Sequence, residues 1–121
     1  MAKILTSVIE PALRASGDPL AADLLERLDG AAAEAPAAKA TRPFSRREAL
    51  RVYQQKAALG DRAPVRTEGY GRLFAALGSA PDEEVIVHGV TFAEAVYLVF
   101  TDPSRTQCVG VLRKVRISGG P

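Results

Sequence analysis

Glu83-Glu-Val-Ile-Val-His-Gly-Val-Thr91 begins the stretch that decides the fold, which continues with Ala93-Glu-Ala-Val-Tyr-Leu-Val-Phe-Thr101 and Gln107-Cys-Val-Gly-Val-Leu-Arg-Lys-Val-Arg-Ile117. Val, Ile, Tyr, Phe and Thr are concentrated in these three runs, and turn residues separate them. The pattern predicts three consecutive β-strands joined by short turns. Asp102-Pro103 is typical of the first two positions of a β-turn between the second and third strands.

The middle run is apolar on both sides of the predicted strand. Val96, Leu98 and Phe100 point one way, and Tyr97 and Val99 point the other way. A half-exposed strand normally alternates apolar with polar residues, so both sides need a cover. Two short helices can cover one side, and the other then requires the N-terminal helices or a second copy of the chain. We therefore expect self-association as a homodimer.

Helical spacing dominates the chain before these strands. The best-marked helix begins at Asp18-Pro19, where Asp18 can accept bonds from first-turn amides and Pro19 suits the first helical position. A second begins at Ser45, which has a glutamate three residues later in a capping-box arrangement. The expected helices cover about 2–15, 19–30, 45–60 and 70–77, with a polar loop at 61–68. The predicted fold is α+β, with about four N-terminal helices followed by a C-terminal three-stranded antiparallel β-meander.

Small residues and prolines suggest how the chain is divided. Residues 35–43 read Ala-Pro-Ala-Ala-Lys-Ala-Thr-Arg-Pro, which is typical of a linker. We interpret 1–34 as an N-terminal helical arm, 44–117 as an α+β body and 118–121 as a flexible tail. The arm is too small to fold alone, so it is expected to pack on the body or on another subunit.

Composition excludes several classes of protein. The chain has 121 residues, of which 47% are hydrophobic and 25% charged, as in a globular domain. No apolar run approaches the roughly 20 residues of a membrane span, and the short apolar start is broken by Glu10, unlike a signal peptide. One cysteine excludes an internal disulfide and a cysteine-rich metal site. We expect a cytoplasmic protein from a bacterium or phage, with no cofactor and no membrane partner.

His88 and Cys108 are the residues best suited to catalysis. A histidine can act as acid, base or ligand near neutral pH, but no second histidine or nearby cysteine completes a metal site around His88. If the three strands pair in sequence order, His88 and Cys108 lie two strand spacings apart, roughly 10 Å, which is too far for a direct hydrogen bond. A small enzyme is the third hypothesis, and it requires a concave pocket beside His88.

A basic segment in the middle of the chain suggests another kind of partner. Residues 41–80 carry eight Lys or Arg and three Asp or Glu, although the whole chain is only +2. Arg47 and Arg51 lie one helical turn apart and could contact phosphates together with Arg42 and Arg46. No second recognition helix and no aromatic platform accompany them. A solvated helix face is the alternative explanation of this charge.

We therefore predict a non-catalytic protein that binds another protein, as an accessory, assembly or inhibitory subunit. The absence of a recognised catalytic motif and the two apolar sides of the middle strand are the grounds for this prediction. The expected contact residues are Val96, Tyr97, Leu98, Val99 and Phe100. The alternative is a small nucleic-acid-binding regulator that uses Arg42, Arg46, Arg47 and Arg51.

Overall fold

The computed structural model describes residues 8–30, 37–60 and 65–116. In chain order the elements are α2 (Glu10–Ala15), α3 (Pro19–Gly30), β1 (Ala37–Ala40), β2 (Phe44–Ser45), α4 (Arg46–Leu59), β3 (Val65–Glu68), α5 (Tyr70–Ser79), β4 (Glu84–Thr91), β5 (Ala95–Thr101) and β6 (Cys108–Arg116). The expected tail and residues 2–7 of the first expected helix lie outside the described residues. Within the described ranges, no helix has the length and apolar character needed to cross a membrane.

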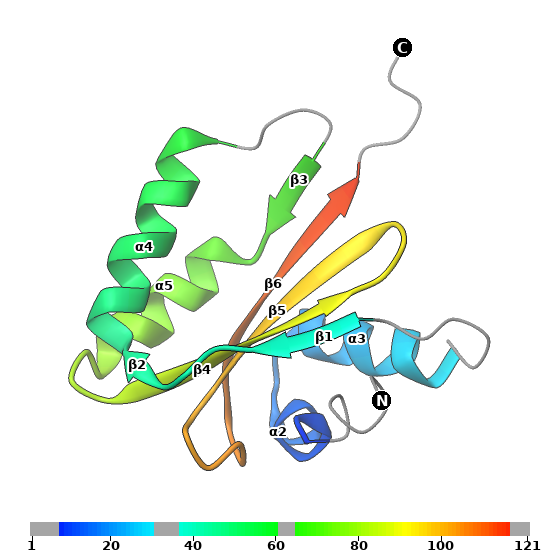
Figure 1. Cartoon of the computed structure of the whole chain (residues 1–121), viewed down its shortest axis with the longest axis horizontal. Helices are drawn as coiled ribbons and strands as arrows, with labels where there is room; N and C mark the ends of the chain where they lie inside the picture. The colour runs from blue at the N-terminus through cyan, green and yellow to red at the C-terminus, as the bar shows by residue number, and fades with distance from the viewer. Residues whose placement is uncertain (1–7, 31–36, 61–64, 117–121) are drawn as a thin grey trace.

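The strands form one antiparallel sheet of six strands (Figure 1). Its order is β1-β4-β5-β6-β3, and β2 pairs with the beginning of β4 on the same side as β1. The three strands expected from the sequence are β4, β5 and β6, and they pair in sequence order. The predicted fold class is nevertheless wrong, because three further strands complete the sheet and the helices alternate with strands along the chain.

The three missed strands are short and carry little apolar alternation. Strand β1 reads Ala-Ala-Lys-Ala inside the expected linker, and β3 reads Val-Arg-Thr-Glu inside the expected polar loop. Alanine, lysine and glutamate are uncommon in strands, so composition gives no signal at these positions. Pairing with long, buried neighbours makes these segments extended: β1 pairs with β4, and β3 pairs with β6.

Helices cover both faces of the central strands. Figure 1 shows α4 and α5 on one side of the sheet and α2 and α3 on the other. On the α2–α3 side, buried Leu13 and Leu24 pack in one core with Tyr97 and Val99. On the α4–α5 side, a second core contains Leu73, Leu77, Val85, Phe100 and Leu112. The chain itself therefore covers both apolar sides of β5, and the pattern no longer argues for a second copy as a cover.

Two helix starts follow from the side chains that precede them. The Asp18 carboxylate accepts a bond from the Leu20 amide at 2.9 Å, and the Ser45 hydroxyl accepts one from the Glu48 amide at 3.1 Å. Both bonds satisfy amides that have no partner within the first helical turn. The Glu48 carboxylate pairs with Arg51.

Two glycines permit close contacts between layers. Gly69 precedes α5 with φ 102°, and a Cβ there would lie 2.5 Å from the Val111 carbonyl oxygen. A Cβ at Gly110 would lie 2.8 Å from the Leu73 side chain, so this glycine allows α5 to pack closely on β6. These contacts hold α5 on the side of the sheet opposite α2 and α3.

Candidate functional site

The contact residues predicted from the sequence are largely covered by the chain's own helices. Tyr97, Val99 and Phe100 are each 0% exposed. Val96 and Leu98 are half-buried on the α4–α5 side. Only the last two therefore present any surface to another molecule.

The four arginines predicted to bind nucleic acid differ in their contacts. Arg47 pairs with Asp82 at 3.0 Å, and Arg51 pairs with Glu48 within α4 at 2.5 Å. Arg46 is half-buried, and its guanidinium lies 3.5 Å from the Ala76 carbonyl oxygen. Arg42 is exposed. Two of the four thus have a carboxylate beside them, which reduces the positive potential available for phosphates.

Cys108 lies away from His88. It begins β6, whereas His88 is on β4, and β5 lies between the two strands. The Cys108 side chain is half-buried against the α2–α3 core, and burial raises the pKa of its thiol. A raised pKa disfavours the reactive thiolate. The structure therefore does not bring the two predicted catalytic candidates together.

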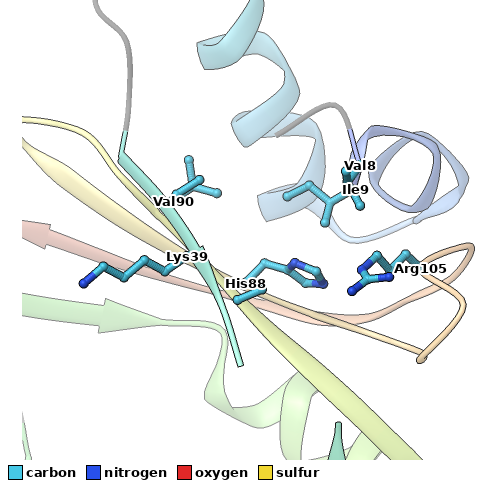
Figure 2. A pocket seen from close by; sticks show the side chains of 8 residues that line it. Val8, Ile9, Lys39, His88, Val90 and Arg105 are labelled. Atoms are coloured by element: carbon cyan, nitrogen blue, oxygen red, sulfur yellow. The ribbon is translucent and has the colours of Figure 1, made fainter. Parts of the chain in front are cut away.

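A pocket of about 320 Å³ lies beside His88 on the α2–α3 side of the sheet. Its walls come from the residues just before α2, from β1 and β4, and from the turn between β5 and β6. Val8, Ile9 and Val90 supply aliphatic surface (Figure 2). The Arg105 guanidinium faces the His88 ring, while the Lys39 ammonium points away from both. The pocket is thus mainly apolar, with the Arg105 guanidinium beside the His88 imidazole, and Lys39, which also lines it, directs its ammonium elsewhere.

His88 is a buried, neutral base. Its side chain is 6% exposed, and its Nε2 lies 2.9 Å from the Thr101 hydroxyl oxygen. Burial, with a further contribution from the positive charge of Arg105, lowers the pKa of His88 to about 4. Both causes disfavour the protonated ring. At neutral pH the imidazole can therefore donate one hydrogen bond and accept another.

A tightly bonded turn presents Arg105 to the pocket. The Asp102 carboxylate accepts bonds from the Thr106 and Gln107 amides, both at 2.9 Å, and from the Ser104 hydroxyl. Burial raises the pKa of Asp102, but these hydrogen bonds outweigh that effect and lower the pKa to about 2. Arg105 has φ 63°, the single positive value among the described non-glycine residues. The turn therefore holds Arg105 in an unusual backbone conformation that directs it to the pocket.

Strand β1 forms both a wall of the pocket and an open edge of the sheet. The Thr41 amide donates to the Val87 carbonyl oxygen at 2.9 Å. Because inward and outward groups alternate along an antiparallel strand, the N–H and C=O groups of Ala38 and Ala40 point away from β4. Nothing in the described part of the chain pairs with these outward groups. Paired with Val90 and His88, the two alanine side chains lie on the pocket side.

His88 and Thr101 are not arranged as a reactive pair that faces the pocket. His88 and Thr101 have the separation of a base and a nucleophile, but the Thr101 side chain is fully buried and does not line the pocket. Arg105 also makes His88 a weaker base, which is the wrong direction for activating a hydroxyl. Within the described ranges, no cluster of His, Cys, Asp and Glu could hold a metal ion.

Sequence reasoning identified only part of this site. It selected His88 as a titratable group and required a pocket beside it, and such a pocket is present. It missed Ile9 and Arg105, which reach His88 only after α2 packs on the sheet and the β5–β6 turn folds back. It also missed the open edge at Ala38 and Ala40. The Asp-Pro-Ser-Arg turn was the one available signal for Arg105.

No family model matches the sequence, and no curated protein or solved structure is significantly similar to it.

Proposed function

We propose that this is a non-catalytic binding protein that holds an extended segment of another polypeptide along strand β1. The observation that carries the proposal is the open edge of β1, which lies directly beside the pocket at His88. An extended segment that adds to a sheet edge gains affinity from main-chain hydrogen bonds and specificity from pockets for its alternate side chains. An accessory, assembly or inhibitory subunit needs this kind of surface.

Main-chain pairing is supported by the small side chains of β1. Ala38 and Ala40 offer two outward N–H and C=O pairs, and neither side chain obstructs an approaching strand. Edge strands are usually protected by shortness, charges, bulges or prolines, and β1 has four residues and one lysine. In β1 the single charged residue is Lys39, which lines the pocket but directs its ammonium away from His88 and Arg105. The edge is thus accessible from the side.

Charge favours a foreign segment over a second copy of this chain. Two copies joined antiparallel through β1 would be related by a twofold axis normal to the sheet, so both Lys39 side chains would lie on the same face. Like charges that face each other across a strand pair are destabilising. A segment with an acidic residue on that face and an apolar residue on the pocket face complements Lys39 and the pocket together.

Proline substitution at the edge tests the proposal. Peptides would be selected from a displayed random library on the full-length chain, and their affinities measured by fluorescence anisotropy. Ala40→Pro removes an outward amide and leaves the inward bonds to β4 in place, so we expect a loss of about tenfold or more. Ala40→Ser is the matched control, because serine keeps the backbone N–H at this position and is similar in size to alanine. Circular dichroism would verify that both variants fold.

Two outcomes would contradict this proposal. One is a selection that returns no peptide, and the other is a set of peptides that bind Ala38→Pro and Ala40→Pro as tightly as the unmodified chain. Binding to duplex DNA at low salt tests the alternative function. Binding that weakens steeply with salt and is lost in Arg47→Glu, Arg51→Glu would identify a nucleic-acid-binding regulator instead.

A further inference from the structure

We propose that the pocket beside His88 is a site for a carboxylate that carries a small apolar group, with Arg105 as its ion-pair partner. This inference concerns the interior of the pocket and does not require a strand to pair with β1. The same chemistry could come from a free aliphatic acid or from the carboxylate of a bound polypeptide segment, and the experiment below separates these sources.

The first argument is the state of Arg105. Six described arginines have a carboxylate within 4.0 Å: Arg14, Arg27, Arg47, Arg51, Arg72 and Arg113. Arg105 is exposed and, like Arg42, Arg46 and Arg66, has no such partner among the described residues, but of these four it alone lines the largely apolar pocket. A guanidinium presents paired N–H donors that match the two oxygens of a carboxylate. An unpaired guanidinium at the wall of this pocket therefore favours a negatively charged ligand.

The second argument is that the backbone of Arg105 is fixed before a ligand arrives. The Asp102 bonds fix the turn, and Arg105 adopts φ 63° within it. A non-glycine residue at positive φ is strained and persists only where its surroundings determine it. Pre-positioning reduces the ordering cost of binding. The turn therefore supports recognition by Arg105, although Asp102 itself does not line the pocket.

The third argument is the size and polarity of the remaining lining. A volume of about 320 Å³ is at the lower end of the range of small-molecule pockets, so the ligand is small. Ile9 and Val90 supply apolar contacts for its body. The His88 ring pairs with Thr101 through Nε2 and lies in the wall of the pocket, facing Arg105. The chemistry of the walls thus fits a short branched aliphatic acid.

Titration with matched small molecules tests the inference. Isovalerate is the probe, and isovaleramide has the same shape without the charge. The NMR signals of His88, the one histidine in the chain, report binding directly. We expect isovalerate to shift these signals and to raise the pKa of His88, because a nearby anion stabilises the imidazolium. Isovaleramide is expected to bind at least about tenfold more weakly.

Variants then assign the charge to Arg105. Arg105→Gln is expected to reduce isovalerate affinity by about tenfold or more. Arg66→Gln is the matched control: it removes the same charge from β3, at the opposite edge of the sheet, and is expected to leave this affinity unchanged. If isovalerate binds only weakly, but Arg105→Gln lowers the affinity of the selected peptides, the carboxylate belongs to the polypeptide. If neither isovalerate nor the peptides respond to Arg105→Gln, the inference is overturned. Peptides that respond to Ala40→Pro in that case would still support the proposed function.

Discussion

At the scale of single residues, burial decides what His88 can do. An isolated histidine carries no information about its own pKa, since the same residue type serves as base, ligand or core side chain. Here 6% exposure and the neighbouring Arg105 both favour the neutral ring. The residue is therefore best suited to a hydrogen bond inside the pocket, and its titration should be visible in the stability of the fold.

We predict that the protein loses stability as the pH falls from about 6.5 towards 4. The pKa of His88 is near 6.5 in the unfolded chain and about 4 in the folded chain, so the unfolded state binds more protons in this interval. The free energy of unfolding should be about 2 kcal/mol lower at pH 5 than at pH 7.5 from this group alone. Urea denaturation at both pH values measures it, and His88→Gln should remove most of the difference. An unchanged difference in that variant would contradict the prediction.

At the scale of elements, one polar cluster ties α3 to the sheet. The Asp23 carboxylate on α3 accepts hydrogen bonds from the Tyr97 hydroxyl and from Arg113, which lies on β6. Arg113 also bonds Glu68 on β3. Burial raises the pKa of Asp23, but the bonds from Tyr97 and Arg113 outweigh it, so the pKa is lowered overall. The Asp23 carboxylate therefore connects α3 directly to β5 and β6.

We predict that Asp23→Ala lowers the free energy of unfolding by about 2 kcal/mol, because it leaves a half-buried guanidinium and a buried hydroxyl with fewer partners. Urea denaturation at pH 7 measures the change. Asp29→Ala is the matched control, since Asp29 is exposed on the same helix. Equal destabilisation by the two substitutions would show that the cluster contributes nothing specific.

Elements were predictable from the sequence where their own side chains show an apolar or capping pattern. They were missed where pairing with a neighbouring strand determines the conformation. The apolar runs of β4, β5 and β6 and the helix starts at Asp18 and Ser45 were readable from residue types. Strand β1 was not, because its extended backbone depends on pairing with β4 and not on its four residues. Ile9 and Arg105 were missed as pocket residues for a related reason, since both lie far from His88 in the sequence.

At the scale of the whole molecule, two helical layers explain the apolar character of β5. A central strand that is covered on both faces should be apolar on both sides, as buried parallel strands usually are. The sequence contained this information, but it did not specify whether the cover was internal or another molecule. The interleaving of helices and strands supplies an internal cover on each side.

This arrangement predicts that the β5 residues expected at an interface act on stability. Phe100 is fully buried and contacts the Tyr53 ring edge-on, with centroids 5.1 Å apart. Phe100→Ala should therefore lower the free energy of unfolding by about 3–5 kcal/mol through lost burial and the cavity left behind. Val96→Ala, at a half-buried position on the same face, should cost about 1 kcal/mol or less. Denaturant melts combined with light scattering show whether Phe100 acts in the stability of the fold or in association with another molecule. A Phe100→Ala chain that keeps its stability but changes its state of association would mean that another molecule, and not α4 and α5, covers this face of the sheet.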